Sequence, residues 1–316
     1  MPKPISVADK TPVNVVIVTL DSHLAGAAER ARPLLQQEIP GLRLTLHAAA
    51  EWDDDPKLLE RCRADIAKGD IVIATMLFMD DQIRALMPAL EARRQSCDAM
   101  VSFMSAGEVI KLTKIGKMDF AKEAKGIMGL IKRLRGKPRG QNQSSGERQM
   151  AMLRRLPRLL RFIPGSAQDL RAYFLTMQYW LAGSDENFAN MIRSLVNRFA
   201  AGPRLALAGS LEVAAPITYP EVGIYHPRLE GRMSADPAAL AAKAGDERPT
   251  VGVLLMRSYV LAENTRHYDA VIAALEAKGM RVVPAFACGL DGRPAIERFF
   301  MKDGAPAIDA LVSLTG

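Results

Sequence analysis

Short runs of apolar, β-branched residues alternate with helical patterns along this chain, and that alternation constrains its fold more than any other feature. The first run, residues 13–20 (VNVVIVTL), is typical of a strand buried on both faces of a parallel sheet. A helix is predicted next, over residues 22–38, with Asp21 or Ser22 as its N-cap. The same patterns predict further strands at 42–48, 71–76 and 99–104 and helices at 56–68 and 81–93. Together they predict a flavodoxin-like, doubly wound α/β head domain over residues 1–115.

A second alternating unit is assigned to residues 211–316, beginning with the segment PITYPEVGIYHPRL. Its predicted strands are 250–256, 280–286 and 308–314, and its predicted helices are 263–278 and 295–301. The last strand is followed only by Thr315 and Gly316. Because a parallel sheet needs cover on both faces, we expect this second α/β domain to be incomplete within the chain.

The region between these units is divided into a basic linker, residues 116–165, and a helical segment, residues 166–210. From Lys111 to Arg161 there are 15 lysines and arginines against three acidic residues, although the net charge of the whole chain is only +7. The centre of this stretch, residues 135–148, lacks apolar periodicity, which predicts a mobile loop. The helical segment carries aromatic residues at helical spacing, and this favours a core role over a binding face. These residues are Tyr173, Phe174, Tyr179 and Trp180.

The basic segment has three interpretations. It is a solvated linker, a docking surface for acidic partner proteins, or a contact with an anionic membrane surface, which would make the protein peripheral to the membrane. Nucleic acid fits least, because the segment has few aromatic residues for stacking and no recognition motif.

Composition also limits the cellular setting and the class of site. The N-terminus lacks the apolar core of a signal peptide, and the longest apolar run, residues 71–79, is about half of what spans a bilayer. Cys62, Cys97 and Cys288 stand singly, without CxxC spacing. This predicts reduced thiols in a cytoplasmic protein, with neither a zinc site nor a disulfide framework.

Asp21 and His23 follow the first predicted strand, at the end of the sheet where α/β proteins bind ligands. Residues 21–26 read D-x-H-x-x-G, which resembles the cobalamin-binding fingerprint in which the histidine coordinates cobalt and the aspartate holds its other nitrogen. The later parts of that fingerprint are not recognisable here. The alternative is that Asp21 caps the helix and that His23 lies in its first turn without a ligand.

In the second unit, five residues flank loops and could contact an anionic ligand or a metal: His226, Arg257, Glu263, His267 and Tyr268. The planar guanidinium of Arg257, at the end of a predicted strand, matches a carboxylate group of a ligand. A histidine or glutamate could accept a proton or bind a cation such as Mg²⁺, which prefers oxygen ligands. Ordinary hydrogen bonding within the loops is the alternative for each residue. No nucleophile and base pair is recognisable, so the catalytic residues stay unassigned.

Two stretches of the chain resemble a known family. The first comprises NVVIVTLDSHLAGAAERARPLL, IVIATMLFMDDQI and MVSFMSAGEVIKLTKIGKMDF; the second is EVGIYHPRL with the residues from VGVLLMRSYVLAENTRHYDAVIAALEAKGM to the RPAIERFF segment. Together they are similar to the N-terminal part of the large, H-type subunit of magnesium chelatase, of the purple-bacterial bacteriochlorophyll type. The second stretch is also similar to the large subunit of cobaltochelatase.

The resemblance implies a subunit that binds protoporphyrin IX and Mg²⁺ as substrates, without a tightly bound cofactor. It makes the five loop residues of the second unit candidates for porphyrin contacts. Arg257 would pair with a propionate, and a histidine or glutamate would take protons from the pyrrole nitrogens or deliver Mg²⁺. It implies two smaller partner subunits, an ATPase motor and its adaptor, that use ATP. The chain itself has no G-x-x-x-x-G-K-[ST] phosphate loop, which agrees with this division of labour. A cobaltochelatase large subunit, or a tetrapyrrole-binding or cobalamin-binding module built around His23, is the alternative.

Overall fold

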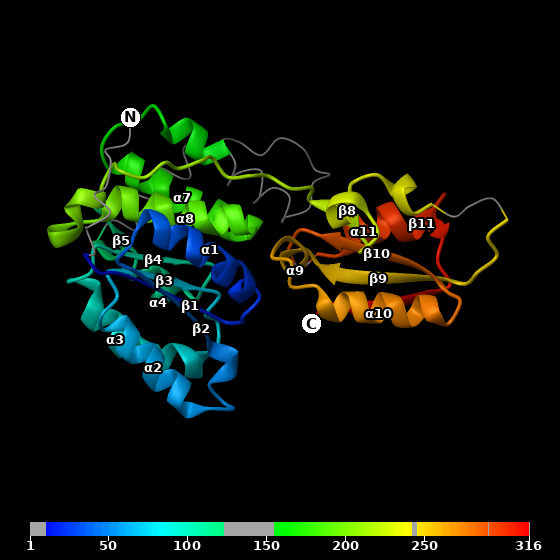
Figure 1. The fold of residues 1–316 in the computed structure, drawn as a ribbon, viewed down its shortest axis with the longest axis horizontal. Helices are drawn as coiled ribbons and strands as arrows, with labels where there is room; N and C mark the ends of the chain where they lie inside the picture. The colour runs from blue at the N-terminus through cyan, green and yellow to red at the C-terminus, as the bar shows by residue number, and fades with distance from the viewer. Residues whose placement is uncertain (1–10, 123–154, 242–244, 290, 316) are drawn as a thin grey trace. The chain divides into compact units, whose positions relative to one another are not determined.

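The computed structural model describes residues 11–122, 155–241, 245–289 and 291–315. The chain divides into two units, Met1–Ile217 and Thr218–Gly316 (Figure 1). The predicted mobile loop, residues 135–148, lies outside the described residues. Within the described parts of the chain, no helix is long and apolar enough to cross a membrane.

The first unit is built on a six-stranded sheet with the order β2-β1-β3-β4-β5-β6. Four parallel strands form its centre, and they confirm the predicted positions: β1 (Val13–Thr19), β2 (Leu42–Ala48), β3 (Ile71–Thr75) and β4 (Ala99–Phe103). Two short antiparallel strands, β5 (Lys114–Ile115) and β6 (Met118–Asp119), extend the edge. Every residue of β3 and β4 is buried, as expected for strands covered on both faces.

Helices cover both faces of this sheet (Figure 1). On one face lie α2 (Pro56–Ile66) and α3 (Asp80–Arg94), which close an apolar core around Val18, Val72 and Leu86. On the other lie α1 (Ala25–Glu38), α7 (Ser166–Ala182) and α8 (Asp185–Phe199). The doubly wound α/β arrangement predicted for the first strands and helices is therefore present.

The predicted helical segment, residues 166–210, packs on the first sheet instead of standing apart from it. Its aromatic residues are core residues, as predicted. The Tyr173 hydroxyl donates to the Ser102 carbonyl oxygen over 3.1 Å, and the rings of Phe103 and Trp180 lie 6.1 Å apart, edge to face. Two bidentate ion pairs, Arg30 with Asp185 and Arg193 with Glu38, join α1 to α8. Both helices had been predicted, over residues 167–182 and 186–199, and they are confirmed. Their packing on the first sheet was not predicted, because contacts between residues so far apart in sequence leave no periodic signal.

The second unit has a five-stranded mixed sheet with the order β13-β9-β10-β7-β8. β9 (Thr250–Met256), β10 (Arg281–Ala287) and β13 (Ala310–Leu314) are parallel, and all three were predicted. β7 (Val222–Tyr225) pairs antiparallel with β10 and with the short β8 (Met233–Ser234). α10 (Arg266–Ala277) covers one face, and α11 (Arg293–Ala295) with a π-helical turn over Ile296–Phe300 covers the other (Figure 1).

Two predictions for this unit were wrong in detail. The helix expected over 263–278 begins only at Arg266, as α10, and a short helix that was not predicted, α9 (Arg257–Leu261), precedes it. Glu263, between the two helices, adopts a left-handed backbone conformation with φ 53°. No strand was predicted over residues 222–225, yet they form β7, and His226 follows it directly. The strand escaped prediction because it is only four residues long and contains Gly223, whose missing side chain leaves room for the Phe286 ring.

Candidate functional site

Arg257 directly follows β9, at the edge where the carboxyl ends of β9 and β10 meet the start of β7. Its side chain is buried, and its donors point at the loop before β7. Nε donates to the Pro220 carbonyl oxygen over 2.7 Å and Nη2 donates to the Tyr219 carbonyl oxygen over 3.2 Å, while Nη1 lies 3.7 Å from the Cys288 sulfur. This guanidinium therefore ties a loop to the edge of the sheet.

Tyr268 anchors the first turn of α10 at the same edge. Its ring is fully buried, and its hydroxyl accepts a hydrogen bond from the Met256 backbone N–H over 3.2 Å. Burial raises the pKa of Tyr268 to about 12, so this hydroxyl stays protonated at neutral pH. Tyr268 therefore positions the turn between β9 and α10.

Glu263 and His267 are the two predicted residues of this edge that are exposed to solvent. Glu263 lies in the turn between α9 and α10, and His267 lies in the first turn of α10. The His267 ring rests on Tyr268, with centroids 4.0 Å apart, and is 5.4 Å from Tyr259. The Glu263 carboxylate, and the His267 imidazole that rests on two tyrosine rings, are groups that can accept protons or bind a cation.

His226 lies apart from the other four residues. It is buried, with Nε2 3.3 Å from Glu276 Oε1, and Nδ1 accepts from the Arg228 backbone N–H over 3.2 Å. Glu276 is in the last turn of α10, so His226 is near the opposite end of that helix from His267. Burial, with the charge of Arg228, lowers the pKa of His226 despite the opposing influence of Glu276. The predicted residues thus do not form a single site.

In the first unit, the structure brings Asp21 and His23 together after β1. A carboxylate oxygen of Asp21 bonds His23 Nδ1 and also accepts from the His23 backbone N–H over 3.3 Å. Burial raises the pKa of Asp21, but the hydrogen bond and charge of His23 outweigh burial, and the net pKa is below its ordinary value. The expected cap was wrong: α1 begins after Leu24, without a side-chain cap, because the Asp21 carboxylate is directed at His23. The imidazole is buried against the Trp180 ring, with centroids 5.8 Å apart.

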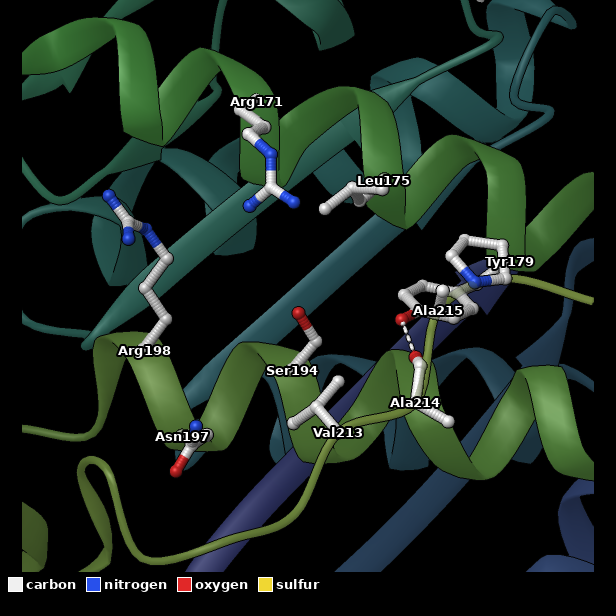
Figure 2. A pocket seen from close by; sticks show the side chains of 10 residues that line it. Arg171, Leu175, Tyr179, Ser194, Asn197, Arg198, Val213, Ala214 and Ala215 are labelled. Carbon is white, nitrogen blue, oxygen red and sulfur yellow. Dashed lines mark hydrogen bonds between the residues drawn. The ribbon is translucent and has the colours of Figure 1, made fainter. Parts of the chain in front are cut away.

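The sequence did not reveal a cavity of about 340 Å³ between α7, α8 and the segment that follows α8. Figure 2 shows its lining side chains. Arg171 points from α7 towards α8, and Arg198 and Ser194 point from α8 towards α7. Their spacing in sequence carries no motif, so a search for known signatures could not find them.

One side of the cavity is formed by residues 211–217, here called the wall segment, which have an irregular backbone. Asparagine side chains of α8 bind this backbone. Asn197 and Asn190 each accept a wall-segment N–H, over 2.9 and 3.0 Å, and Asn187 both accepts from and donates to the backbone of residue 217, over 2.9 and 3.1 Å. The Tyr179 hydroxyl donates to the carbonyl oxygen of residue 214. Because the wall segment belongs to no sheet, these side chains provide hydrogen-bond partners for its backbone and hold it against α7 and α8.

No group of three or more histidine, cysteine, aspartate or glutamate side chains in the described residues is arranged to hold a metal ion. The lining of the cavity, with its arginines and apolar side chains, suits an organic ligand.

Two family models match the chain, and together they cover nearly all of it. Residues 14–174 match a domain of unknown function, DUF3479, and residues 177–316 match the CobN/Magnesium Chelatase family. The chain is 52% identical over 303 residues to the magnesium-chelatase H subunit of Cereibacter sphaeroides and 48% identical over 303 residues to that of Rhodobacter capsulatus. Each match covers 96% of this chain and 25% of the relative, so the chain spans about a quarter of the length of these relatives.

Two further matches are to cobaltochelatases. The aerobic cobaltochelatase subunit CobN of a Sinorhizobium species is 31% identical over 107 residues, covering 32% of this chain and 8% of that protein. Among solved structures, the catalytic subunit of cobaltochelatase from Mycobacterium tuberculosis matches with a TM-score of 0.40 and 16% identity, over 95% of this chain and 18% of that one. Since the first model covers about half of the residues, the chain belongs to the DUF3479 family, and over nearly its whole length it is similar to the H subunits of purple-bacterial magnesium chelatases.

Proposed function

We propose that this chain is part of a magnesium chelatase H-type subunit, which binds protoporphyrin IX and takes part in the ATP-dependent insertion of Mg²⁺ in bacteriochlorophyll synthesis. The observation that carries the proposal is the 52% identity to the Cereibacter sphaeroides subunit over 96% of the chain. Identity at this level over both units favours the magnesium enzyme over cobaltochelatase, which matches at 31% over only a third of the chain.

ATP is used by other subunits in this proposal. The chain contains no phosphate loop, so nothing in it could bind ATP in the manner of P-loop ATPases. Two smaller partner subunits, an ATPase motor and its adaptor, would dock on the H-type subunit in the cytoplasm. The basic stretch from Lys111 to Arg161 would attract acidic surfaces on these partners, because its charge is concentrated in one segment.

The contribution of the second unit would come from its exposed edge. Glu263 and His267 are accessible there, and either could accept a proton from a pyrrole nitrogen or pass on Mg²⁺ with part of its water shell. Arg257 and Tyr268 would position this edge, because their polar atoms already bond the backbone. His226, at the other end of α10, would act on the stability of the unit.

A chimera tests the proposal directly. The segment of the Cereibacter sphaeroides H subunit that aligns with this chain is replaced by the chain, and the product is assayed for Mg-protoporphyrin IX with the partner subunits, ATP and Mg²⁺. We expect activity within about tenfold of the parent. A matched control chimera carries the corresponding segment of a CobN subunit and should be inactive. A folded chimera that carries this chain and binds the partners, yet forms no product, would contradict the proposal.

The same chimera allows the exposed edge to be tested. Glu263→Gln and His267→Gln should each slow metal insertion, while Arg266→Gln, an exposed change on the same turn, should not. Unchanged insertion rates in both variants would remove these two residues from the proposal without affecting the family assignment.

A further inference from the structure

The cavity in the first unit has no part in the function proposed above, yet it has the make-up of a ligand site. Its volume of about 340 Å³ is at the lower end of the range of about 300–1,000 Å³ found for small-molecule pockets. Its lining combines apolar side chains, among them Leu175, Val213 and Pro216, with a few polar groups that point inward. That combination is typical of sites for small organic ligands.

The polar groups of the cavity are cationic or neutral, and its lining residues in the described part of the chain include no acidic side chain. Arg171 donates from Nε to the Pro157 carbonyl oxygen over 3.1 Å, and this bond fixes the position of the guanidinium group. Arg198 donates from Nη2 to Asp169 Oδ1 over 2.6 Å. Arg171 thus uses Nε to fix its position and retains its terminal N–H groups for an anion. Arg198 is already in an ion pair with the Asp169 carboxylate, which offsets its charge, and it contributes its remaining N–H groups.

The cavity is also rigid on the side where a ligand would pack. The wall segment is held by the asparagine side chains of α8 and by the Tyr179 hydroxyl, through hydrogen bonds to its backbone. Burial raises the pKa of Tyr179 to about 12, although the charge of Arg171 acts in the opposite direction. The Tyr179 hydroxyl therefore remains a donor to the wall segment at neutral pH. A preformed wall lowers the entropy lost when a ligand is ordered.

We propose that this cavity binds an organic carboxylate, with the charged group held by Arg171 and Arg198 and the apolar body packed on Leu175 and the wall segment. A planar guanidinium matches the two oxygens of a carboxylate, and Ser194 offers a further donor from α8. The apolar lining favours an organic acid over inorganic phosphate. Two sources share this chemistry: a carboxylate side chain of a tetrapyrrole and a small free organic acid. The proposal does not depend on the chelatase assignment.

The test is a set of binding titrations with the 316-residue chain. The probes are cyclohexanecarboxylate, its neutral amide, inorganic phosphate, deuteroporphyrin IX and the dimethyl ester of deuteroporphyrin IX. Binding is followed by calorimetry and by the ¹⁵N signals of the arginine side chains. We expect a carboxylate probe to bind and to shift the Arg171 signal, and we expect its neutral counterpart and phosphate to bind at least about tenfold more weakly.

The variants separate a site in this cavity from general attraction to a basic protein. Arg171→Gln should weaken binding of the carboxylate by about tenfold or more. Arg84→Gln, which removes an exposed arginine from α3, should leave it unchanged. Ser194→Leu should also weaken binding, because it fills the cavity and removes a donor. Backbone ¹H–¹⁵N spectra establish that each variant is folded.

Each outcome decides the proposal. Loss of deuteroporphyrin binding in Arg171→Gln supports the site with a tetrapyrrole as source, and loss of cyclohexanecarboxylate binding alone supports it with a free acid as source. The proposal is overturned if neither cyclohexanecarboxylate nor deuteroporphyrin binds the unaltered chain. If both cavity variants bind cyclohexanecarboxylate and deuteroporphyrin as tightly as the unaltered chain does, the site is overturned while the chelatase proposal stays intact.

Discussion

Replacing Arg257 with alanine tests which of two roles this arginine has. It either binds a propionate of the porphyrin or holds the loop before β7 to the edge of the second sheet. Its guanidinium donates to the carbonyl oxygens of Tyr219 and Pro220, over 3.2 and 2.7 Å. We predict that Arg257→Ala loosens the second unit whether or not a tetrapyrrole is present. Any loss of porphyrin binding would then follow from the loss of structure.

The size of the effect can be estimated from these bonds. A hydrogen bond from a charged donor contributes about 1.5–3 kcal/mol to stability. Tyr219 and Pro220 are only half-buried, so water can replace part of what is lost when the guanidinium is removed. A cost of about 2–3 kcal/mol for the two bonds together is therefore reasonable. That cost corresponds to a rise of about 30- to 150-fold in the population of the opened unit.

Hydrogen exchange measured by mass spectrometry suits this test better than tryptophan fluorescence. Both tryptophans, Trp52 and Trp180, belong to the first unit, so their emission would not report on β9 and β10. Peptides that cover β9 and β10 should exchange about 30- to 150-fold faster in Arg257→Ala. The control is Arg266→Ala, an exposed change at the first residue of α10, which should alter stability by less than about 0.5 kcal/mol.

The reasoning would be refuted by one clear pattern. If exchange in β9 and β10 stayed as in the unaltered chain while porphyrin binding by the full-length subunit was lost, the guanidinium would be a ligand-binding group. The guanidinium would then bond the two carbonyl oxygens only in the ligand-free protein and would exchange them for the ligand on binding.

Three further predictions concern stability. Gly223→Ala should destabilise the second unit by about 1–3 kcal/mol in urea unfolding, because its new Cβ would lie 2.7 Å from the Phe286 ring, whereas Gly107→Ala meets nothing within 4 Å and should be nearly neutral. The lowered pKa of His226 means that the unfolded chain binds a proton more readily, so the unfolding free energy of this unit should fall as pH drops below 6.5. His226→Gln should remove that dependence, and a pH profile that the substitution leaves unchanged would contradict the assignment to His226. Asn187→Ala should speed hydrogen exchange in the wall segment by about tenfold, and equal exchange would mean that the α8 side chains do not hold it.

The strands of both parallel arrays could be predicted because a strand buried on two faces needs a continuous apolar run. Residues 13–20 and 250–256 are such runs, and each forms a central strand. The antiparallel β7 has only four residues and contains Gly223, so its pattern did not differ from that of a loop. The break between α9 and α10 depends on the left-handed conformation of Glu263, a backbone state rare for residues with a side chain.

The candidate site was less predictable than the fold, because a motif does not indicate whether its donors are already used. Arg257 lies at the end of a strand, as the sequence suggested, but its hydrogen-bond partners are 37 and 38 residues earlier in the chain. Asp21 and His23 are two residues apart, and their contact could be expected from sequence alone. Arg171 and Arg198 lie on two helices whose packing only the folded unit defines.

The number of donors already used decides which arginines can bind an anion. If the guanidinium of Arg257 turned towards a ligand, it would leave two carbonyl oxygens without their partners, at a cost similar to what the new bonds would contribute. Arg171 bonds one carbonyl oxygen through Nε, and it can add a carboxylate through its terminal nitrogens without breaking that bond. The net gain on binding an anion is therefore larger at Arg171, although Arg257 is in the more familiar position at the end of a strand. We therefore predict that Arg171→Gln weakens anion binding more than Arg257→Lys does. The comparison is made in the same titrations, with an Arg257→Lys chain whose second unit stays folded.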